Sequence, residues 1–430
     1  MSSAITPATE LSIAVWPGTS PRLLLETPGV EHYAEYADGG GYQAVDDPDR
    51  LLDEVARSGL LGRGGAAFPL AIKLRTVRDA GGAGAGGQPV VLANGEEGEP
   101  ASVKDKWLLR NRPHLVLDGV RLAARIVGAE RAVVYVSDPL AAQAMEAALA
   151  AVDLELSVGV VTVDPGYVAG EETAAVRAVN GGPAKPTDKP PRPFQVGVDG
   201  QPTLVSNVET LANLPFVLRH GGAAFRAVGT DDSAGTFLAT VTGAGRQPVL
   251  YELPHGVSFS ELLALHGVSA ENVSGVLMGG YFAGLLNRDV LNATLDHETM
   301  RALGSGLGCG AIAILTDDCP VAVAAAVMAY FDRENASQCG SCFNGTAAMS
   351  AVTSALRDGV ATADDLARLE RWSVVLRGRG ACATLDAATN VAASLLLQYP
   401  ELVARHLDGE CDACRADAFS ALRPYEVEAS

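Results

Sequence analysis

The sequence predicts a mixed α/β chain made of three successive parts. Strand–helix–strand alternation over about residues 89–163 is typical of a doubly wound, mostly parallel sheet. After Gly221 the pattern changes to short strands broken by turns, which indicates a small α+β module. From Pro320 onward the chain is helix-periodic, which predicts a bundle of four antiparallel helices. We therefore expect domains at residues 1–225, 235–318 and 319–430.

The composition narrows the classes of protein to which this chain can belong. Hydrophobic residues make up 48% of it, enough for several cores, and no apolar run reaches the length of a membrane span. Lys and Arg number 32 against 51 Asp and Glu, a net charge of −19 that argues against nucleic acid or an anionic membrane as the main partner. Residues 1–20 lack the pattern of a signal peptide, so we expect a cytoplasmic protein.

The cysteines concentrate near the carboxyl end of the chain. Five of the seven follow residue 338, and four of these form two C-x-x-C pairs. In a cytosolic protein such pairs indicate metal or cluster ligation rather than a disulfide framework. Cys309 lies in an apolar, glycine-flanked strand and Cys319 at a helix start, so we expect both to be small core residues.

The first part opens with about fifty irregular residues and then a glycine-rich stretch, Gly62 to Pro69, followed by Lys73. An amphipathic run, Leu51 to Leu61, precedes the stretch, and a helix from Leu70 to Val77 follows it. Glycines let the backbone approach a flat or phosphorylated ligand, and a helix N-terminus attracts anions. The stretch matches no established glycine motif, so a surface turn is the alternative. Gly81 to Gly87 predicts a flexible loop.

The first predicted strand, Pro89 to Ala93, ends in an acidic turn that carries Glu96, Glu97 and Glu99. In open α/β sheets ligands bind at the carboxyl ends of the strands, which makes this turn a candidate site. The alternative is a solvated acidic turn. The next expected elements are a helix over His114–Ile126 closed by Gly128, a strand over Arg131–Ser137, a helix capped by Asp138 and Pro139, and a strand over Leu154–Val163.

Further along, polar residues gather at two helix starts. Glu171 and Glu172 occupy a first helical turn, where a purely structural role is the alternative. Residues 181–203, which include Lys189, are rich in Pro and Gly and predict a long functional loop. Ser206 to Glu209 has the pattern of a capping box and predicts a further helix.

The second and third parts are predicted from periodicity. Ser258 to Glu261 caps a short helix of the α+β module. The expected strands of that module cover Thr236–Thr242, Pro248–Leu253, Gly275–Met278 and Ala311–Leu315. The expected helices of the third part cover about 320–337, 342–358, 363–376 and 384–399.

The motifs occur in a fixed order: GRGGAAF with Lys73, NGEEGEPASVKD, YVAGEET, KPP, SNVETLAN, a C-x-x-C pair and one later cysteine. In this the chain resembles the NADH-binding flavoprotein subunit of respiratory complex I and its relatives in NAD-linked hydrogenases and formate dehydrogenases. The likeness runs from about Leu52 to about Gln398. It implies a Rossmann-like α/β FMN domain, a small ubiquitin-like (SLBB-type) α+β domain and a C-terminal four-helix iron–sulfur bundle.

The resemblance also implies residues for two ligands. Glycines would approach the flavin ring, Lys73 and Glu97 would modulate the flavin, and the helix after Ser206 would offer N–H groups and hydroxyls to the phosphate. The implied FMN residues are Gly62, Arg63, Gly64, Gly65, Lys73, Asn94, Glu96, Gly170, Glu171, Ser206, Asn207 and Thr210. The implied NADH residues are Phe68, Glu99, Glu172 and Lys189.

Three positions near these ligands depart from the family pattern. Ala67 stands where the family usually has glycine, and Thr76 and Arg192 stand where it has aromatic residues beside the adenine. Stacking on a base is worth about 1–3 kcal/mol per ring, so losing two rings predicts NADH binding weaker by about a hundredfold or more. Arg192 could instead stack or contact a 2′-phosphate, which would favour NADPH.

The cysteines depart from the family as well. The resemblance assigns Cys339, Cys342 and Cys382 to the cluster, but Ala336 stands in place of the first ligand. Three outcomes follow: a 3Fe–4S cluster, a 4Fe–4S cluster with water or Asn335 as external ligand, or a 4Fe–4S cluster completed by the tail. The last is our preferred expectation. The tail pair, Cys411 and Cys414, would complete it, or would form a zinc site with Cys339 and Cys342 as the alternative.

The leading functional prediction is an FMN- and iron–sulfur-dependent subunit that oxidises NADH and passes single electrons to a partner, either other redox subunits or a ferredoxin. It would be part of a hetero-oligomer, without membrane insertion or nucleic-acid binding. One alternative is a flavin and iron–sulfur relay between proteins that does not use NAD(P)H. Another is a structural subunit without redox chemistry, against which the retained Glu97, Glu99 and Glu172 argue.

Overall fold

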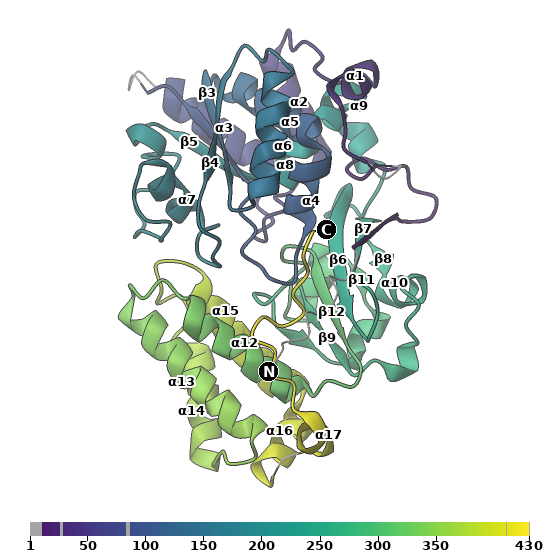
Figure 1. The fold of residues 1–430 in the computed structure, drawn as a ribbon, viewed down its shortest axis with the longest axis vertical. Coiled ribbons are helices and arrows are strands. Elements are labelled where there is room, and N and C mark those ends of the chain that lie inside the picture. The colour runs from purple at the N-terminus through teal and green to yellow at the C-terminus, as the bar shows by residue number, and fades with distance from the viewer. Residues whose placement is uncertain (1–10, 26–28, 83–86, 410, 430) are drawn as a thin grey trace, which may run out of the picture.

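A four-stranded parallel sheet forms the first part of the molecule (Figure 1). The computed structural model describes residues 11–25, 29–82, 87–409 and 411–429, so the predicted loop at Gly81 to Gly87 lies largely outside the described residues. The strand order is β4-β3-β2-β5, which confirms the predicted parallel α/β sheet. The strands are β2 (Val90–Asn94), β3 (Arg131–Val136), β4 (Ser157–Thr162) and β5 (Thr203–Asn207).

Helices cover both faces of this sheet because its strands are apolar on both sides. Val91 and Ala93 of β2 pack into the core that α3, α5 and α6 cover, whereas Val90 and Leu92 face the smaller core beneath α7. The helices of this part are α1 (Tyr33–Asp38), α2 (Pro48–Ser58), α3 (Leu70–Gly82), α4 (Lys104–Asn111), α5 (Pro113–Val127), α6 (Pro139–Ala150), α7 (Glu172–Val179), α8 (Val208–Ala212) and α9 (Leu214–Arg226).

The helix boundaries follow local sequence signals. Asp138 caps α6 by accepting a hydrogen bond from the Ala141 N–H, and Pro139 occupies the first helical position, as predicted. Gly128 ends α5 with a left-handed backbone. The predicted capping box at Ser206 is wrong: Ser206 lies in β5, and Asn207 caps α8 with its side chain.

A six-stranded mixed sheet forms the second part, in the order β1-β7-β6-β12-β9-β10. Its first strand comes from the N-terminal region that we expected to be irregular. Ser12 of this strand pairs with Val249 in parallel register. The elements are β1 (Ser12–Val15), β6 (Thr236–Gly243), β7 (Val249–Pro254), β8 (Val257–Ser258), α10 (Phe259–Leu265), β9 (Gly275–Met278), β10 (Leu285–Leu286), β11 (Thr294–Leu295), α11 (His297–Ala302) and β12 (Ala311–Leu315).

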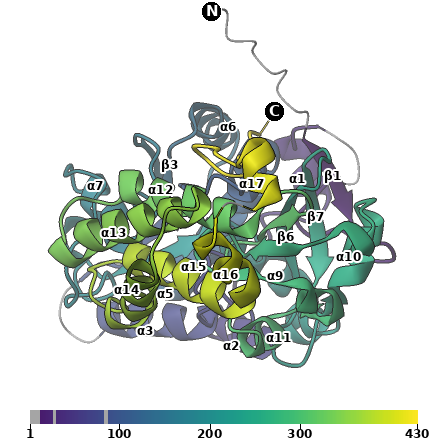
Figure 2. The ribbon, with the colours of Figure 1, turned by 90° about the horizontal axis from the view of Figure 1, so that it is seen from below.

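The third part is helical and lies below the other two in Figure 1. The predicted helices are present, and two short ones follow them and lie at one end of the group (Figure 2). After the last helix the chain returns to the first part, where the Val427 N–H donates to the Pro100 carbonyl at 3.0 Å. The helices are α12 (Pro320–Glu334), α13 (Gly340–Arg357), α14 (Ala363–Val375), α15 (Thr384–Gln398), α16 (Pro400–Leu407) and α17 (Asp412–Asp417).

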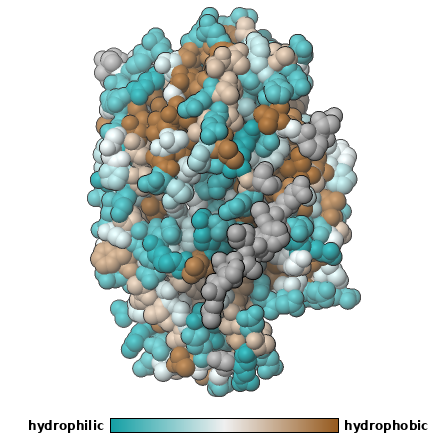
Figure 3. Space-filling view, viewed as in Figure 1, coloured by the Kyte–Doolittle hydropathy of each residue, from teal (hydrophilic) through white to brown (hydrophobic). Residues whose placement is uncertain are grey.

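The face of the molecule drawn in Figure 3 is mainly polar. Hydrophilic residues cover most of the face seen in Figure 3, and apolar residues appear there in small groups. Within the described residues, no helix combines the length and apolar character that crossing a membrane requires.

Candidate functional site

A cavity of about 630 Å³ lies where the three parts of the molecule meet. The carboxyl ends of β2 and β5 form one wall, loops of the second sheet contribute Phe282 and Cys309, and the segment before α15 contributes Cys382. Its volume lies within the range of about 300–1,000 Å³ that is typical of ligand sites. The residues predicted from the sequence that line it are Gly62, Gly64, Gly65, Phe68, Lys73, Asn94, Glu96, Glu97, Glu99, Gly170, Glu171, Glu172, Lys189, Ser206, Asn207, Thr210 and Cys382.

The glycine-rich stretch between α2 and α3 forms the floor of the cavity. A Cβ at Gly64 would lie 3.1 Å from the Asn207 Cβ, a tight contact, so the close approach of the two segments favours glycine. Gly65 has a φ of +113°, and Ala67 has a φ of 50°, in the left-handed region. The loop is therefore shaped by backbone conformations that favour glycine at both positions.

Arg63 does not line the cavity, which corrects its assignment to the FMN residues. Its guanidinium is buried and donates to the carbonyls of Ala234 and Thr236, each at 3.1 Å. Its backbone N–H donates to Thr210 Oγ1 at 2.8 Å. Arg63 therefore fastens the glycine-rich stretch to the strand β6 and to α8, and acts on the site only through that position.

Glu96 and Lys73 are buried polar groups in the part of the cavity that carries the predicted FMN residues. One oxygen of Glu96 accepts from the Gly166 N–H at 3.4 Å, whereas Oε2 is buried without a hydrogen-bond partner. Burial raises the pKa of Glu96 to about 7. Lys73 Nζ donates to the Val205 carbonyl at 2.7 Å, and burial lowers its pKa. The unpaired oxygen of Glu96 would gain a hydrogen bond from a polar ligand.

The glutamates of the acidic turn differ in their surroundings. Glu97 accepts from the N–H groups of Asp105 and Lys106, at 3.2 and 3.0 Å, and so holds the start of α4. Glu99 accepts from the Tyr281 N–H at 2.9 Å, and burial raises its pKa to about 8. Glu99 is therefore the acid of this turn that links the cavity to the second sheet.

Two of the four predicted NADH residues, Glu172 and Lys189, form an ion-paired group at the cavity wall together with Glu171, a predicted FMN residue. Lys189 Nζ lies 2.6 Å from Glu171 and 3.0 Å from Glu172, and these carboxylates raise its pKa although burial opposes them. Glu171 also caps α7 by accepting from the N–H groups of its first turn. Arg192 lies 3.8 Å from Glu172. A nucleotide that contacts Glu172 would therefore compete with Lys189 and Arg192.

Two aromatic residues that the sequence analysis missed also line the cavity. Phe194 follows Arg192 by two residues, and Phe282 comes from the second sheet. Phe282 is 36% exposed and Phe68 is 49% exposed, as expected for rings at the wall of an open cavity. The expected loss of stacking at Thr76 and Arg192 therefore has candidate replacements, which only the folded chain brings together.

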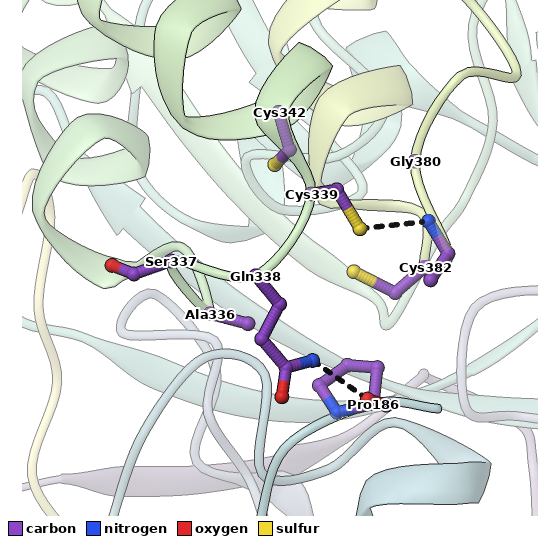
Figure 4. Close-up of a pocket in the computed structure, with 9 residues that line it drawn as sticks. Pro186, Ala336, Ser337, Gln338, Cys339, Cys342, Gly380 and Cys382 are labelled. Carbon is purple, nitrogen blue, oxygen red and sulfur yellow. Dashed lines mark hydrogen bonds between the residues drawn. The ribbon is translucent and has the colours of Figure 1, made fainter. Parts of the chain in front are cut away.

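Three cysteines face one another next to the large cavity. Cys339, Cys342 and Cys382 line a small pocket together with Ala336 and Gln338, and Figure 4 shows the Cys339 and Cys382 sulfurs turned into it. The Ala381 N–H donates to the Cys339 sulfur at 3.4 Å. Three thiols in one pocket suit iron corners of a cluster, whereas Ala336 offers no ligand. Cys382 lines both this pocket and the large cavity.

The tail cysteines do not join this group, which overturns the preferred completion of the cluster. Cys411 and Cys414 gather instead with Cys319 and His406. Cys319 immediately precedes α12, and Cys339 lies five residues beyond its end, so the 15-residue helix, about 22 Å long at 1.5 Å per residue, lies between the two thiol groups. The alternative zinc site with Cys339 and Cys342 is excluded for the same reason. Cys319, which we expected to be a small core residue, also belongs to the group of the tail cysteines.

Cys309 is also placed differently from the expectation. It precedes β12 instead of lying within a strand, and it lines the large cavity beside Glu99. Burial raises the pKa of its thiol. Cys309 therefore lines the cavity wall and also packs against the neighbouring apolar core.

The residues present fit the groups that the motifs imply. The cavity combines a close glycine backbone, an orphaned buried carboxylate at Glu96 and the amine of Lys73, which suit the ring and polar edges of a flavin. The three-thiol pocket beside it supplies the ligand type that iron–sulfur clusters require.

Comparisons with known proteins agree with this site. Residues 55–216 match the Nuo51 FMN-binding domain, and residues 322–406 match the NADH-ubiquinone oxidoreductase-F iron-sulfur binding region. The chain is 32% identical to the F 2 subunit of the NADH-quinone oxidoreductase of Rhizobium meliloti (strain 1021), covering 90% of this chain and 97% of that protein. It is 30% identical to the HndC subunit of the NADP-reducing hydrogenase of Solidesulfovibrio fructosivorans, covering 89% of this chain and 80% of that protein.

Solved structures give the same result. The air-oxidised NAD+-reducing NiFe hydrogenase matches with a TM-score of 0.77 and 30% identity, over 94% of this chain and 70% of that one. The H2-reduced form matches with a TM-score of 0.76 and 30% identity, over 84% of this chain and 63% of that one. The chain therefore belongs to the family of F-type subunits of NADH-quinone oxidoreductases, which oxidise NADH through FMN and an iron–sulfur cluster.

Proposed function

We propose that NADH oxidation in this chain takes place at FMN held in the large cavity, and that electrons leave through a cluster held by Cys339, Cys342 and Cys382. Bound FMN supplies the ability to accept two electrons together and release them one at a time. The observation that carries this proposal is the position of Cys382, which lines both the large cavity and the thiol pocket. A cluster ligand at the cavity wall gives electrons a short exit.

The flavin would be held chiefly by backbone and by two buried charges. Gly64 and Gly65 would let the chain lie against the ring, and Lys73 lines the cavity with its Nζ held 2.7 Å from the Val205 carbonyl. Glu96 has a free buried oxygen that can accept an N–H from the ligand when ionised or donate when protonated. These contacts would hold FMN without a covalent bond to the protein.

The nicotinamide nucleotide would bind at the outer wall. Phe68 and Phe282 are exposed rings there, and Glu172 can accept hydrogen bonds from ribose hydroxyls. A 2′-phosphate would bring negative charge towards Glu172, so NADH is the expected substrate. Lys189 and Arg192, which lie 3.0 and 3.8 Å from Glu172, are cations that oppose this preference.

The cluster would lack a fourth protein ligand. Asn335, one of the expected external ligands, uses Nδ2 to bond Asp332 and Oδ1 to bond the Ser337 N–H, so its side chain is engaged. A 4Fe–4S cluster with water at the open iron is therefore the preferred form, and 3Fe–4S is the alternative. Ala336→Cys tests this, because it restores a thiol at the pocket and should raise the iron content of a three-iron form towards four.

The relatives are named as subunits of NADH-quinone oxidoreductases and hydrogenases, which supports a hetero-oligomer in which partner redox subunits take the electrons. A ferredoxin as acceptor is the other arrangement. All seven cysteines are free, which supports a reducing, cytoplasmic location. The division of labour would follow three domains: a flavin domain, a small α+β domain of the ubiquitin-like SLBB type, and a four-helix iron–sulfur bundle.

Anaerobic purification followed by flavin identification and rapid mixing tests the proposal. We expect FMN to be released on denaturation, and NADH to bleach the bound flavin faster than NADPH does. Gly65→Val, which fills the cavity floor, should lose the flavin. If neither nucleotide bleaches a correctly bound flavin, the protein-to-protein relay replaces this proposal.

A further inference from the structure

Four potential metal ligands gather at the start of α12, away from the cavity and the thiol pocket. Cys319 comes just before α12, His406 lies near the end of α16, and Cys411 and Cys414 belong to the start of α17 and its first turn. One ligand atom from each lies within 4.8 Å of the others. Segments almost a hundred residues apart in the chain therefore converge on one small space.

His406 is oriented as a metal ligand. Its Nδ1 lies 2.8 Å from the Leu356 carbonyl oxygen, and because a carbonyl only accepts, Nδ1 carries the proton. In the neutral ring this leaves the lone pair on Nε2, which lies 3.4 Å from the Cys319 sulfur. Histidines that bind metals commonly donate their other ring N–H to a carbonyl in this way.

The spacing of the ligand atoms fits a single tetrahedral ion. With Zn–S of about 2.3 Å and Zn–N of about 2.0–2.1 Å, tetrahedral geometry separates two sulfurs by about 3.8 Å and sulfur from nitrogen by about 3.6 Å. The Cys319 and Cys411 sulfurs lie 3.7 Å apart, and the Cys319 sulfur lies 3.4 Å from His406 Nε2. We infer that Cys319, His406, Cys411 and Cys414 bind one structural Zn²⁺.

The surroundings favour a closed structural site over a catalytic one. His406 is fully buried, and Cys319 and Cys414 are 6% and 8% exposed. Four protein ligands leave no open position for water or substrate, which is the mark of structural zinc.

This site is distinct from the iron–sulfur site of the family. The iron–sulfur region matches residues 322–406 and so omits three of the four ligands here. A cubane binds each thiolate through a different iron, which spreads the sulfurs further apart than a single ion does. The inference therefore stands whether or not the proposed electron path is correct.

The ion would anchor the C-terminal tail across the molecule. Beyond α17, Tyr425 donates to Asp318 Oδ2 at 2.6 Å, next to the ligand Cys319. Further on, the Val427 N–H donates to the Pro100 carbonyl, in the turn that carries Glu99. The tail thus connects the helical part to the acidic turn of the cavity, and the metal fixes its starting point.

Metal and sulfide analysis of the full chain, purified anaerobically, tests the inference. We expect about one zinc per chain in addition to iron and sulfide. Cys414→Ser should lose zinc and keep iron and sulfide, whereas Cys382→Ser, the matched control at the other group, should lose iron and sulfide and keep zinc. Removal of zinc by a chelator should speed tryptic cleavage at Arg415 and Arg423 by about tenfold or more.

A second measurement covers the case in which Cys414→Ser does not fold. Cobalt added to chelator-treated wild-type protein should give the intense visible bands of tetrahedral thiolate-bound Co²⁺ at one equivalent. Octahedral cobalt spectra, a wild-type protein without zinc, or a Cys319–Cys411 disulfide found by mass spectrometry would each overturn the inference. Iron and sulfide lost together in Cys414→Ser but retained in Cys382→Ser would show a cluster there instead.

Discussion

Two sulfur-rich groups lie near the two ends of α12, and they differ in the number of metal ligands that the protein supplies. At its start, Cys319 is buried with three partners that complete a tetrahedron. Beyond its end, Cys339 belongs to a pocket with three thiols and the inert side chain of Ala336, and this pocket adjoins a large open cavity. The group at the start of α12 (the closed group) has all four metal ligands and lies away from the large cavity. The group beyond its end (the open group) has three thiols, one fewer than a cubane takes, and adjoins the cavity.

The backbone shows the same contrast. Cys319 and Cys411 have ordinary extended backbones, with φ of −69° and −75°. Around the open group, Ala67 and Ser337 have φ of 50° and 54°, which L-residues seldom adopt. The cavity and the thiol pocket therefore each contain an L-residue in the left-handed region, whereas the two tail-site cysteines named here have extended backbones. The difference suggests that one group serves exchange and the other serves stability.

The largest expected effect separates the two groups directly. Cys382→Ser should leave bleaching of the flavin by NADH within about twofold, but reduce electron delivery to cytochrome c by at least about a hundredfold, about 2.7 kcal/mol in the barrier. The reason is that the substitution removes an iron ligand at the cavity wall. Stopped-flow absorbance measures both rates.

Cys414→Ser is the paired control for this experiment. It should leave both rates unchanged while lowering the temperature of unfolding, because it opens only the closed group. An electron delivery rate in Cys382→Ser equal to that of the wild type would mean that the two groups do not divide the work in this way.

The next effect concerns the unpaired carboxyl of Glu96. Its pKa in the folded protein is about 7, above the ordinary value of 4.5, so the folded state retains a proton that the unfolded chain has already lost. Stability is therefore full below about pH 4.5 and falls as pH rises through about 7. In flavin-free protein, Glu96→Gln should remove this fall, worth at most about 3 kcal/mol between pH 4.5 and 8.

Urea unfolding at several pH values measures the effect, with Glu146→Gln on the exposed face of α6 as the control. If wild type and Glu96→Gln lose stability in parallel between these pH values, the carboxyl of Glu96 does not have the raised pKa that its burial in the cavity predicts.

A smaller effect is expected at the nucleotide wall. Glu172→Ala should raise KM for NADH by about tenfold, or about 1.4 kcal/mol, because it removes an acceptor for ribose hydroxyls. The value of kcat should change little, since Glu172 is not expected to contact the reacting atoms. Steady-state kinetics with Glu146→Ala as control test this, and an unchanged KM would remove Glu172 from the nucleotide site.

Sequence reasoning predicted the parallel sheet because motifs and strand ends are local features, and all of its predicted FMN and NADH residues except Arg63 line the cavity. It missed β1, whose partner β7 follows more than 200 residues later, and β5, whose TLVSN segment follows a Pro-rich loop. It also misplaced Arg63, because a motif gives the identity of a residue but not the direction of its side chain.

The tail site shows a second limit of the sequence. Two C-x-x-C pairs are equally plausible partners by spacing alone, and only the length of α12 shows that they cannot meet. His406 gave no signal, since a single histidine on an amphipathic helix has no pattern. Its role depends on the Leu356 carbonyl and Cys319, which lie 50 and 87 residues away in the chain.

The smallest expected effect tests backbone strain at the open group. Ala67 has a φ of 50°, a conformation that costs an L-residue about 1–2 kcal/mol and glycine almost nothing. Glycine also adds freedom to the unfolded chain, which costs about 0.5–1 kcal/mol. Ala67→Gly should therefore raise the free energy of unfolding by about 1 kcal/mol or less.

Ala66→Gly is the matched control, because Ala66 belongs to the same loop and is not among the residues with positive φ. It should lose about 0.5–1 kcal/mol, since it bears the cost of glycine without relieving strain. Chemical denaturation of both variants measures the difference, which cancels the entropy of glycine and leaves the backbone strain at Ala67. Equal destabilisation by the two substitutions would mean that the cavity loop stores no strain, and the contrast with the closed group would then rest on ligands alone.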